Sequence, residues 1–325
     1  MRWTRRSTAA ALAAGLLRPA AAQDAGRFPD RPIRMVVPFA AGGAADLVAR
    51  LVAQGMSDNL RQPVVVDNRG GSGGVIGSDL VAKAAPDGHT IVFHTLSSAV
   101  LNAALYRSMP FDTRRAFAPV SLVGTVPNLV VVGARFPART LAEFLALLRA
   151  NPGRHTYASS GAGTILHLSA HMLCTQAGVN ATHVPYRGAG PALNDLVAGV
   201  VDFMVDTMPT DLPFVRDGTL RALAISTRAR SPALPEVPTA AEAGLPGFET
   251  YNWHAVYGVA GTPPAILARL ERAAREAVSS EALGGRLREL GVDTAGSTAA
   301  ELERFWDEQI AQWVPVVRSS GATAE

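Results

Sequence analysis

The residues best suited to chemistry lie in short loops that are rich in glycine, serine and threonine. The loop Ser159–Thr164 reads SSGAGT, and the loop Thr95–Ser98 reads TLSS. A hydroxyl group could be a nucleophile, but neither loop carries a G-x-S-x-G nucleophile elbow. Hydroxyls and backbone N–H groups at the start of a helix can instead donate hydrogen bonds to an oxyanion that does not react. We therefore interpret both loops as parts of a binding site.

Two histidines that are four residues apart could belong to a metal site. His167 and His171 would share one face of a predicted helix. A metalloprotease helix needs a glutamate at the position that Leu168 occupies. Zinc sites need three or four ligands, and the sequence indicates no third one. We expect no metal, with His167 facing a cleft and His171 facing solvent.

A glycine-rich stretch at residues 70–77 suggests a nucleotide site but has the wrong spacing. Its sequence, GGSGGVIG, contains no G-x-G-x-x-G, and no acidic residue follows at the end of the next strand. Lys83 is the only lysine, and it does not follow a glycine loop in the manner of a P-loop. We expect no cofactor and interpret the stretch as a tight turn between a closely packed strand and helix.

The segment that opens the fold reads as a strand, a glycine turn and an amphipathic helix. Ile33–Val37 is apolar and rich in β-branched residues, Gly42 and Gly43 follow, and apolar residues then recur at helical spacing from Leu47. Unpaired N–H groups and the positive end of the helix dipole would make this turn an anion site. Asp46 could contact a ligand, but a helix cap is the simpler interpretation.

The rest of the chain repeats the alternation of strand and helix. Capping boxes, in which a threonine is followed three residues later by a glutamate, predict helices that begin near residues 141, 240 and 299. This order favours an α/β fold with mainly parallel sheets. Further strands are predicted at residues 64–67, 90–94, 129–132, 156–159, 184–186, 203–206 and 220–225.

The first 22 residues resemble a secretory signal peptide. Arginines at positions 2, 5 and 6 precede an Ala/Leu-rich run that ends in three alanines. The paired arginines are compatible with twin-arginine export as well as with the Sec route. Without this segment the chain has 26 basic and 27 acidic residues, so its charge gives no argument for nucleic acid. Cys174 is the only cysteine, which excludes an intramolecular disulfide.

Five motifs in order resemble one protein family. The chain is similar to the solute receptors of tripartite tricarboxylate transporters, called Bug proteins, from about residue 28 to its C-terminal helix. One position departs from the family, which usually has glutamate where His171 stands. The motifs are RPIRMVVPFAAGGAADLVAR at 31–50, PVVVDNRGGSGGVIG at 63–77, AKAAPDGHTIVF at 82–93, HVPYRGAGPALNDLVAGVVDFMVD at 183–206 and GTLRALAISTRARSPALPEVPTAAEAG at 218–244.

The resemblance implies the fold of a type II periplasmic binding protein. Such a protein is α/β and has two lobes, like a Venus flytrap, with the ligand cleft between them. It also implies that the C-terminal segment returns to the first lobe. Lobe 1 would then comprise residues 23–124 and 249–325, and lobe 2 residues 125–248. The two crossings are expected near residues 122–126 and 247–253.

The site is expected beyond the carboxyl ends of the strands, where open α/β sheets bind ligands. The loops there are rich in N–H groups and hydroxyls, and only Arg187 is cationic. Such a site would hold a carboxylate without an arginine clamp, and the resemblance implies the same, partly through water. Phe39 and Tyr186 would form apolar walls. The candidate ligand-binding residues are Phe39, Gly42, Gly43, Asp46, Thr95, Ser97, Ser98, Ser159, Ser160, Gly161, Thr164, His167, Tyr186, Gly188 and Asp206.

The expected function is that of a solute receptor in the periplasm of a Gram-negative bacterium. It would bind a small organic carboxylate, deliver it to the membrane permease of a tripartite tricarboxylate transporter, and catalyse no reaction. Diacids, triacids, amino acids and aromatic acids all fit such loops. One alternative is a secreted hydrolase or isomerase that uses the region of Ser160 and His167. Another is a sensor that presents its ligand to a signalling protein.

Overall fold

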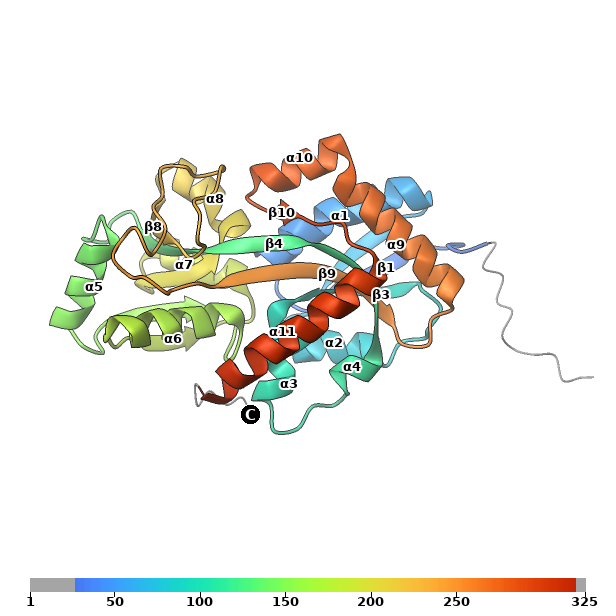
Figure 1. Cartoon of the computed structure of the whole chain (residues 1–325), viewed down its shortest axis with the longest axis horizontal. Helices are drawn as coiled ribbons and strands as arrows, with labels where there is room; N and C mark the ends of the chain where they lie inside the picture. The colour runs from blue at the N-terminus through green and yellow to red at the C-terminus, as the bar shows by residue number, and fades with distance from the viewer. Residues whose placement is uncertain (1–26, 320–325) are drawn as a thin grey trace, which may run out of the picture.

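The computed structural model describes residues 27–319 (Figure 1). The predicted signal peptide, residues 1–22, lies outside the described residues. The strands are β1 (Ile33–Val37), β2 (Val64–Asn68), β3 (Thr90–Thr95), β4 (Phe117–Gly133), β5 (Thr156–Ser159), β6 (Thr182–Pro185), β7 (Phe203–Thr207), β8 (Leu220–Ile225), β9 (Tyr251–Val259) and β10 (Asp293–Thr294). The helices are α1 (Ala44–Leu60), α2 (Val75–Ala82), α3 (Asn102–Leu105), α4 (Thr113–Ala116), α5 (Leu141–Ala150), α6 (Ile165–Ala177), α7 (Ala189–Ala198), α8 (Met208–Arg216), α9 (Pro264–Ser279), α10 (Glu281–Glu289) and α11 (Ala299–Ser319), with single turns η1 (Ser72–Gly74) and η2 (Ser97–Leu101).

The strands form an α/β structure with a parallel group at each end. In the first half, β1 pairs in parallel with β2 and β3. In the second half, β5 pairs in parallel with β6 and β7. The strands between these groups are antiparallel, because β9 pairs with β3 and β4, and β4 pairs with β7 and β8. The predicted α/β class is therefore confirmed, whereas parallel pairing is limited to the two ends.

The two halves are joined through β4 and β9, which cross the middle of the molecule (Figure 1). β4 is 17 residues long. Its residues Phe117–Pro127 pair with β9, and from Asn128 onward it lies between β7 and β8. The change of partner between Pro127 and Asn128 marks one crossing between two lobes. The exact lobe limits stay a prediction.

Three differences from the sequence prediction concern β4, β9 and the segment after Thr239. The predicted strand at 129–132 is only the end of β4, and β9 was not predicted at all. Prolines at positions 119 and 127 conceal β4, since proline interrupts the pattern expected of a strand. The helix predicted after Thr239 is wrong. Its capping box forms, with Glu242 N donating to Thr239 Oγ1 (3.1 Å), but only turns follow, because Gly244 adopts a positive φ of 93°.

The C-terminal helices pack against the first half of the chain. α9 lies on α1, and α11 lies along β4 and η2. The buried indole of Trp306 in α11 donates a hydrogen bond to the carbonyl of Ala99 (3.0 Å) and stacks edge-on against Tyr257 of β9. Within residues 27–319, no helix has both the length and the apolar composition needed to cross a membrane.

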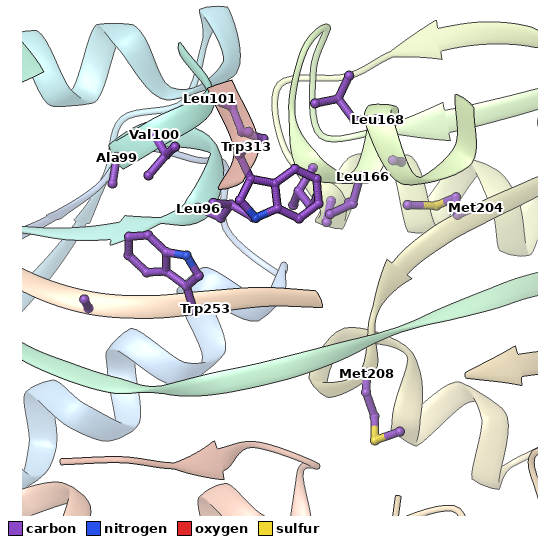
Figure 2. Close-up of a cluster of buried hydrophobic side chains, with 14 of the residues drawn as sticks. Leu96, Ala99, Val100, Leu101, Leu166, Leu168, Met204, Met208, Trp253 and Trp313 are labelled. Atoms are coloured by element: carbon purple, nitrogen blue, oxygen red, sulfur yellow. The ribbon is translucent and has the colours of Figure 1, made fainter. Parts of the chain in front are cut away.

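One cluster of buried apolar side chains contains residues from both halves (Figure 2). Leu96 follows β3 in the first half, and Leu166 and Met204 belong to the second. Trp253 of β9 and Trp313 of α11 lie in the same cluster. The loops that follow the strands thus pack on one apolar cluster that is shared by both halves.

Candidate ligand site

A small cavity of about 30 Å³ lies where loops of the two halves meet. Five predicted site residues line it, namely Phe39, Gly43, Thr95, Ser97 and Ser160. None of the lining side chains is charged. The lining residues that were not predicted are Ala40, Ala44, Ala45, Leu166, Ala189, Thr207 and Asn252.

Four helices begin at this cavity. Ala44 starts α1, Leu166 is in the first turn of α6, Ala189 starts α7, and Thr207 directly precedes α8. The side chains of the four N-cap residues accept no capping hydrogen bond. The first N–H group of α6, that of Ile165, donates to Ser97 Oγ (2.9 Å), and the positive ends of the four helix dipoles meet at this one cavity, which favours an anion there. The N-cap residues are Gly43, Thr164, Gly188 and Thr207.

Thr95 presents an unpartnered hydroxyl at the cavity. Its side chain is 3% exposed, and within residues 27–319 its Oγ1 has no hydrogen-bond partner. A buried polar group without a partner costs about 1–3 kcal/mol, so a ligand acceptor at this point would be stabilised. The neighbouring Asn252 is fixed because its Oδ1 accepts from the backbone N–H groups of Leu96 (3.2 Å) and Trp253 (2.9 Å).

Asp46 closes the opening loop rather than lining the cavity. Its Oδ2 accepts from the backbone N–H of Gly42 (3.0 Å), and its other oxygen pairs with Arg50 (2.9 Å). Gly42 has a positive φ of 89°, which favours glycine. The capping role thus accounts for Asp46, and the tight turn accounts for Gly42.

The loops of the two halves contact each other directly. Ala40 N donates to the carbonyl of Arg187 (3.3 Å), and Ile165 N donates to Ser97 Oγ (2.9 Å). Gly188 approaches Ala40 so closely that a Cβ on Gly188 would lie 2.8 Å from Ala40 N. Any ligand much larger than the cavity can therefore enter only when the loops separate.

The hydroxyls of the loop Ser159–Thr164 mainly bond within the loop. Ser159 Oγ donates to Gly161 O (3.0 Å), Ser160 Oγ to Thr164 Oγ1 (3.2 Å), and Thr164 Oγ1 to Gly161 O (2.8 Å). Ser98 has a similar role, because its Oγ accepts from Thr95 N (3.0 Å). Of the residues whose hydroxyls are described here, Ser160 lines the cavity, and Ser98, Ser159 and Thr164 fix the shape of its walls.

The predicted orientation of His167 toward the cleft is wrong. Its ring stacks on His183 at 3.9 Å between centroids, and its Nδ1 accepts from Gly163 N (3.0 Å). Burial, reinforced by the nearby His171, lowers the pKa of His167 to about 4, and burial, reinforced by His167, lowers that of His183 to about 3. His183, which the sequence analysis missed, also hydrogen bonds to Ser159 Oγ (2.7 Å). Both rings therefore support the loop from behind in the neutral form.

The serine–histidine pair that the enzyme alternative needs is not assembled within residues 27–319. Ser160 Oγ donates to Thr164, and His167 accepts from a backbone N–H, so the two side chains do not form a nucleophile–base pair. Among residues 27–319, no group of three or more histidine, cysteine, aspartate or glutamate side chains is arranged to hold a metal ion.

A G-x-S-x-G spacing does occur elsewhere in the chain, at residues 70–74. Ser72 has a positive φ of 49°, as a nucleophile elbow requires. Its side chain is exposed and hydrogen bonds to Tyr106, whose pKa is raised by burial more than this bond lowers it. A histidine base would have to be within reach of the serine, and the observed partner is a tyrosine.

Tyr186 and Asp206 do not line the cavity either. Tyr186 Oη donates to Asp195 Oδ2 (2.5 Å), and burial together with this carboxylate raises the pKa of Tyr186 to about 12. On β7 it is Thr207, one residue further on, that reaches the cavity, because adjacent strand residues point to opposite faces. Tyr186 thus forms no apolar wall.

Asp206 belongs to a buried pair of carboxyl groups with Asp211. Asp206 Oδ1 accepts from the N–H (2.6 Å) and the hydroxyl (3.2 Å) of Thr207. Burial nevertheless raises the pKa of Asp206 to about 7, and burial plus the nearby Asp206 charge raises that of Asp211 well above its usual range. The pair therefore retains protons at pH values where exposed aspartates are ionised.

Comparisons with known proteins agree with this architecture. Residues 48–322 match the model of the tripartite tricarboxylate transporter family receptor. The chain is 42% identical over 91% of its length to a UPF0065 protein from the tcbD-tcbE intergenic region of a Pseudomonas species, covering 88% of that protein. It is 38% identical over 95% of its length to protein BugT of Bordetella pertussis, covering 94% of it.

Solved structures give the same result. The Rhodopseudomonas palustris protein Rpa4515, solved with adipate, superposes with a TM-score of 0.88 at 36% identity, covering 91% of this chain and 99% of that one. MatC from the same species, with bound malate, superposes with a TM-score of 0.85 at 36% identity, covering 89% of this chain and 100% of that one. The periplasmic binding protein BugD superposes with a TM-score of 0.87 at 33% identity, covering 92% of this chain and 100% of that one. The chain therefore belongs to the tripartite tricarboxylate transporter receptor family, whose members are two-lobed periplasmic binding proteins.

Proposed function

We propose that this protein is a periplasmic receptor that binds a small organic carboxylate between its two lobes and delivers it to a tripartite tricarboxylate permease. The observation that carries the proposal is that four helices, whose N-cap side chains form no capping hydrogen bond, begin at one cavity without charged side chains. This arrangement stabilises a carboxylate through N–H groups and helix dipoles. The relatives solved with adipate and with malate support a ligand of the dicarboxylate class.

The proposed cycle includes an opening of the cleft. A cavity of about 30 Å³ is far smaller than the few hundred Å³ of typical ligand pockets, so the loops must part before a diacid enters. The loops would then close on the ligand in a cavity wider than the one that the contacts Ala40–Arg187 and Ser97–Ile165 leave here. Lobe 1 would comprise residues 23–124 and 249–325, and lobe 2 residues 125–248.

The remaining parts of the proposal follow from the family. The signal peptide at residues 1–22 would direct export, and the membrane partner would be the permease of the transporter. The protein would return its ligand chemically unchanged. A purified sample that bound a carboxylate and converted it to a product would contradict this.

The hydroxyl of Thr95 provides a direct test of the site. Thr95→Val keeps the side-chain shape but removes a donor that faces the cavity, so affinity for the carboxylate should fall about tenfold. Thr113→Val is the matched control, because the Thr113 hydroxyl is also buried and unpartnered within residues 27–319 but does not line the cavity. Thermal-shift and calorimetric titrations with malate, adipate, citrate, glutamate and benzoate would measure this. Equal affinities in both variants would show that the ligand binds elsewhere.

A further inference from the structure

A second and much larger pocket lies on the other face of the crossing strands. Its volume is about 560 Å³, within the range of pockets that bind small molecules. Tyr251 of β9 lines this pocket, whereas the next residue, Asn252, lines the small cavity. Because consecutive strand residues point to opposite faces, the pocket and the cavity lie on opposite sides of the crossing. We call it the hinge pocket.

The walls of the hinge pocket come from both lobes. Residues 125–127 of β4 and Tyr251 of β9 contribute the crossing strands. Residues 225–232 after β8 form the wall on the second half, and residues 288–293 with Phe305 of α11 form the wall on the first half. An occupant would therefore touch both lobes and both crossings at once.

The lining combines an apolar surface with two guanidinium groups. Arg230 is held in place, since its Nε donates to Glu242 (2.8 Å) and its Nη1 to the carbonyl of Pro235 (2.9 Å). Arg288 is exposed and, within residues 27–319, its side chain forms no ion pair. One carboxylate, that of Asp293, also lines the pocket, and Glu242 pairs with Arg230, so within residues 27–319 Arg288 is the lining cation that has no ion pair. The apolar members are Val126, Pro127, Ile225, Ala229, Pro232, Val292 and Phe305, with half-buried Tyr251.

We propose that the hinge pocket binds a small amphipathic anion, namely a monocarboxylate with an aromatic or branched apolar body, and that its occupation favours the closed cleft. The apolar body would pack between Phe305, Val126 and Pro232. The anionic head would lie near Arg288, whose planar guanidinium suits a carboxylate. Such a molecule differs from the ligand of the cleft, which contacts N–H groups and hydroxyls but no cation.

The coupling follows from the position of the pocket behind the hinge. In this structure the cleft loops touch, as the Ala40–Arg187 hydrogen bond shows, and the hinge pocket is open. A rotation about β4 and β9 that parts the loops moves the walls of the hinge pocket toward each other. An occupant that fits the wide pocket therefore opposes opening of the cleft. By linkage, the cleft ligand and the pocket ligand should strengthen each other's binding by the same factor. This coupling rests on the proposed function, whereas binding in the pocket does not.

The test uses 3-phenylpropionate as the probe, titrated by calorimetry into the full mature chain. Arg288→Gln should weaken its binding about tenfold, because one charge-assisted contact is lost. Arg304→Gln is the control, since Arg304 precedes Phe305 on α11 but does not line the pocket. Ala229→Trp should abolish binding by filling the pocket. The uncharged amide of the probe should bind more weakly than the acid.

The cleft variant Thr95→Val separates the two sites. It should leave binding of 3-phenylpropionate unchanged, while saturating 3-phenylpropionate should increase the affinity of wild-type protein for malate or adipate. Absence of binding at millimolar concentration, or a loss in Thr95→Val with none in Arg288→Gln, would overturn the proposal. Binding that depends on Arg288 without any change in dicarboxylate affinity would overturn the coupling. If no dicarboxylate binds at all, binding that depends on Arg288 would still support the hinge pocket and only the proposed function would fail.

Discussion

Closure of the cleft can be blocked by a single methyl group at Gly190. This residue is in the first turn of α7, and its φ is not in the left-handed region, so alanine is compatible with the backbone. A Cβ on Gly190 would overlap the carbonyl oxygen of Ala41 and lie 3.2 Å from Cα and C of Gly42. All three atoms belong to the opposite lobe. Gly190→Ala should therefore disturb the closed form and leave the open form intact.

The size of the effect follows from the cost of overpacking. Extra atoms in a packed contact typically cost about 1–3 kcal/mol. If the ligand binds the closed form, this cost appears in its affinity, which should fall by about 5- to 150-fold at 1.4 kcal/mol per tenfold.

The assay compares Gly190→Ala with a helix glycine that has room for a methyl group. A Cβ on Gly285 in α10 would have its nearest neighbour, Arg288 Nη2, at 4.0 Å. Calorimetry with the best ligand of the panel should show weak binding for Gly190→Ala and normal binding for Gly285→Ala. Small-angle scattering should show that saturating ligand reduces the radius of gyration of wild-type protein more than that of Gly190→Ala. Wild-type affinity in Gly190→Ala would refute closure of these loops around the ligand.

Further predictions concern stability. Burial raises the pKa of Asp206 to about 7 and that of Asp211 well above its unfolded value, so the folded state binds more protons than the unfolded state. The free energy of unfolding should therefore fall as pH rises from about 4 to 7. The slope should be up to about 1.4 kcal/mol per pH unit for each group. Asp211→Asn should flatten this slope in urea unfolding between pH 5 and 8, and an unchanged slope would show that the pair does not titrate. Burial lowers the pKa of His183 to about 3, so the folded state holds this imidazole in its neutral form and stability should be lost as pH falls below about 6.5. His183→Gln should therefore unfold at a lower pH than wild type. Gln309→Leu leaves the buried Trp253 N–H without its acceptor at 3.2 Å and should cost about 1–3 kcal/mol in chemical denaturation, whereas the exposed Gln312→Leu should cost little.

Local patterns in the sequence were sufficient to predict the elements at the two ends of the fold. β1 and the helix after it follow from an apolar run, a glycine turn and helical periodicity, and the capping boxes before α5 and α11 both form. The crossing strands could not be predicted in this way. Residues of β4 include two prolines, and β9 depends on pairing with strands far away in the sequence. Tertiary pairing decided these elements, and periodicity did not.

The same limit applies to the site. The loops after β1, β3, β5 and β7 were predicted to surround the ligand, and residues from all four line the cavity. The sequence did not allow us to predict which side chain of each loop faces the cavity. Thr207 lines the cavity instead of Asp206, and Tyr186 pairs with Asp195 instead of forming a wall. A shift of one residue reverses the face, and only the packed structure fixes it.

The central claim is that helix N-termini hold the carboxylate groups of a small acid. Isothermal titration calorimetry of malate and adipate, each compared with its uncharged dimethyl ester, tests this most directly. At least one diacid should bind with a Kd in the micromolar range, about −8 kcal/mol, and its ester should not bind. If neither diacid binds, or if an ester binds as tightly as its acid, the four helix N-termini are not the anion site described above.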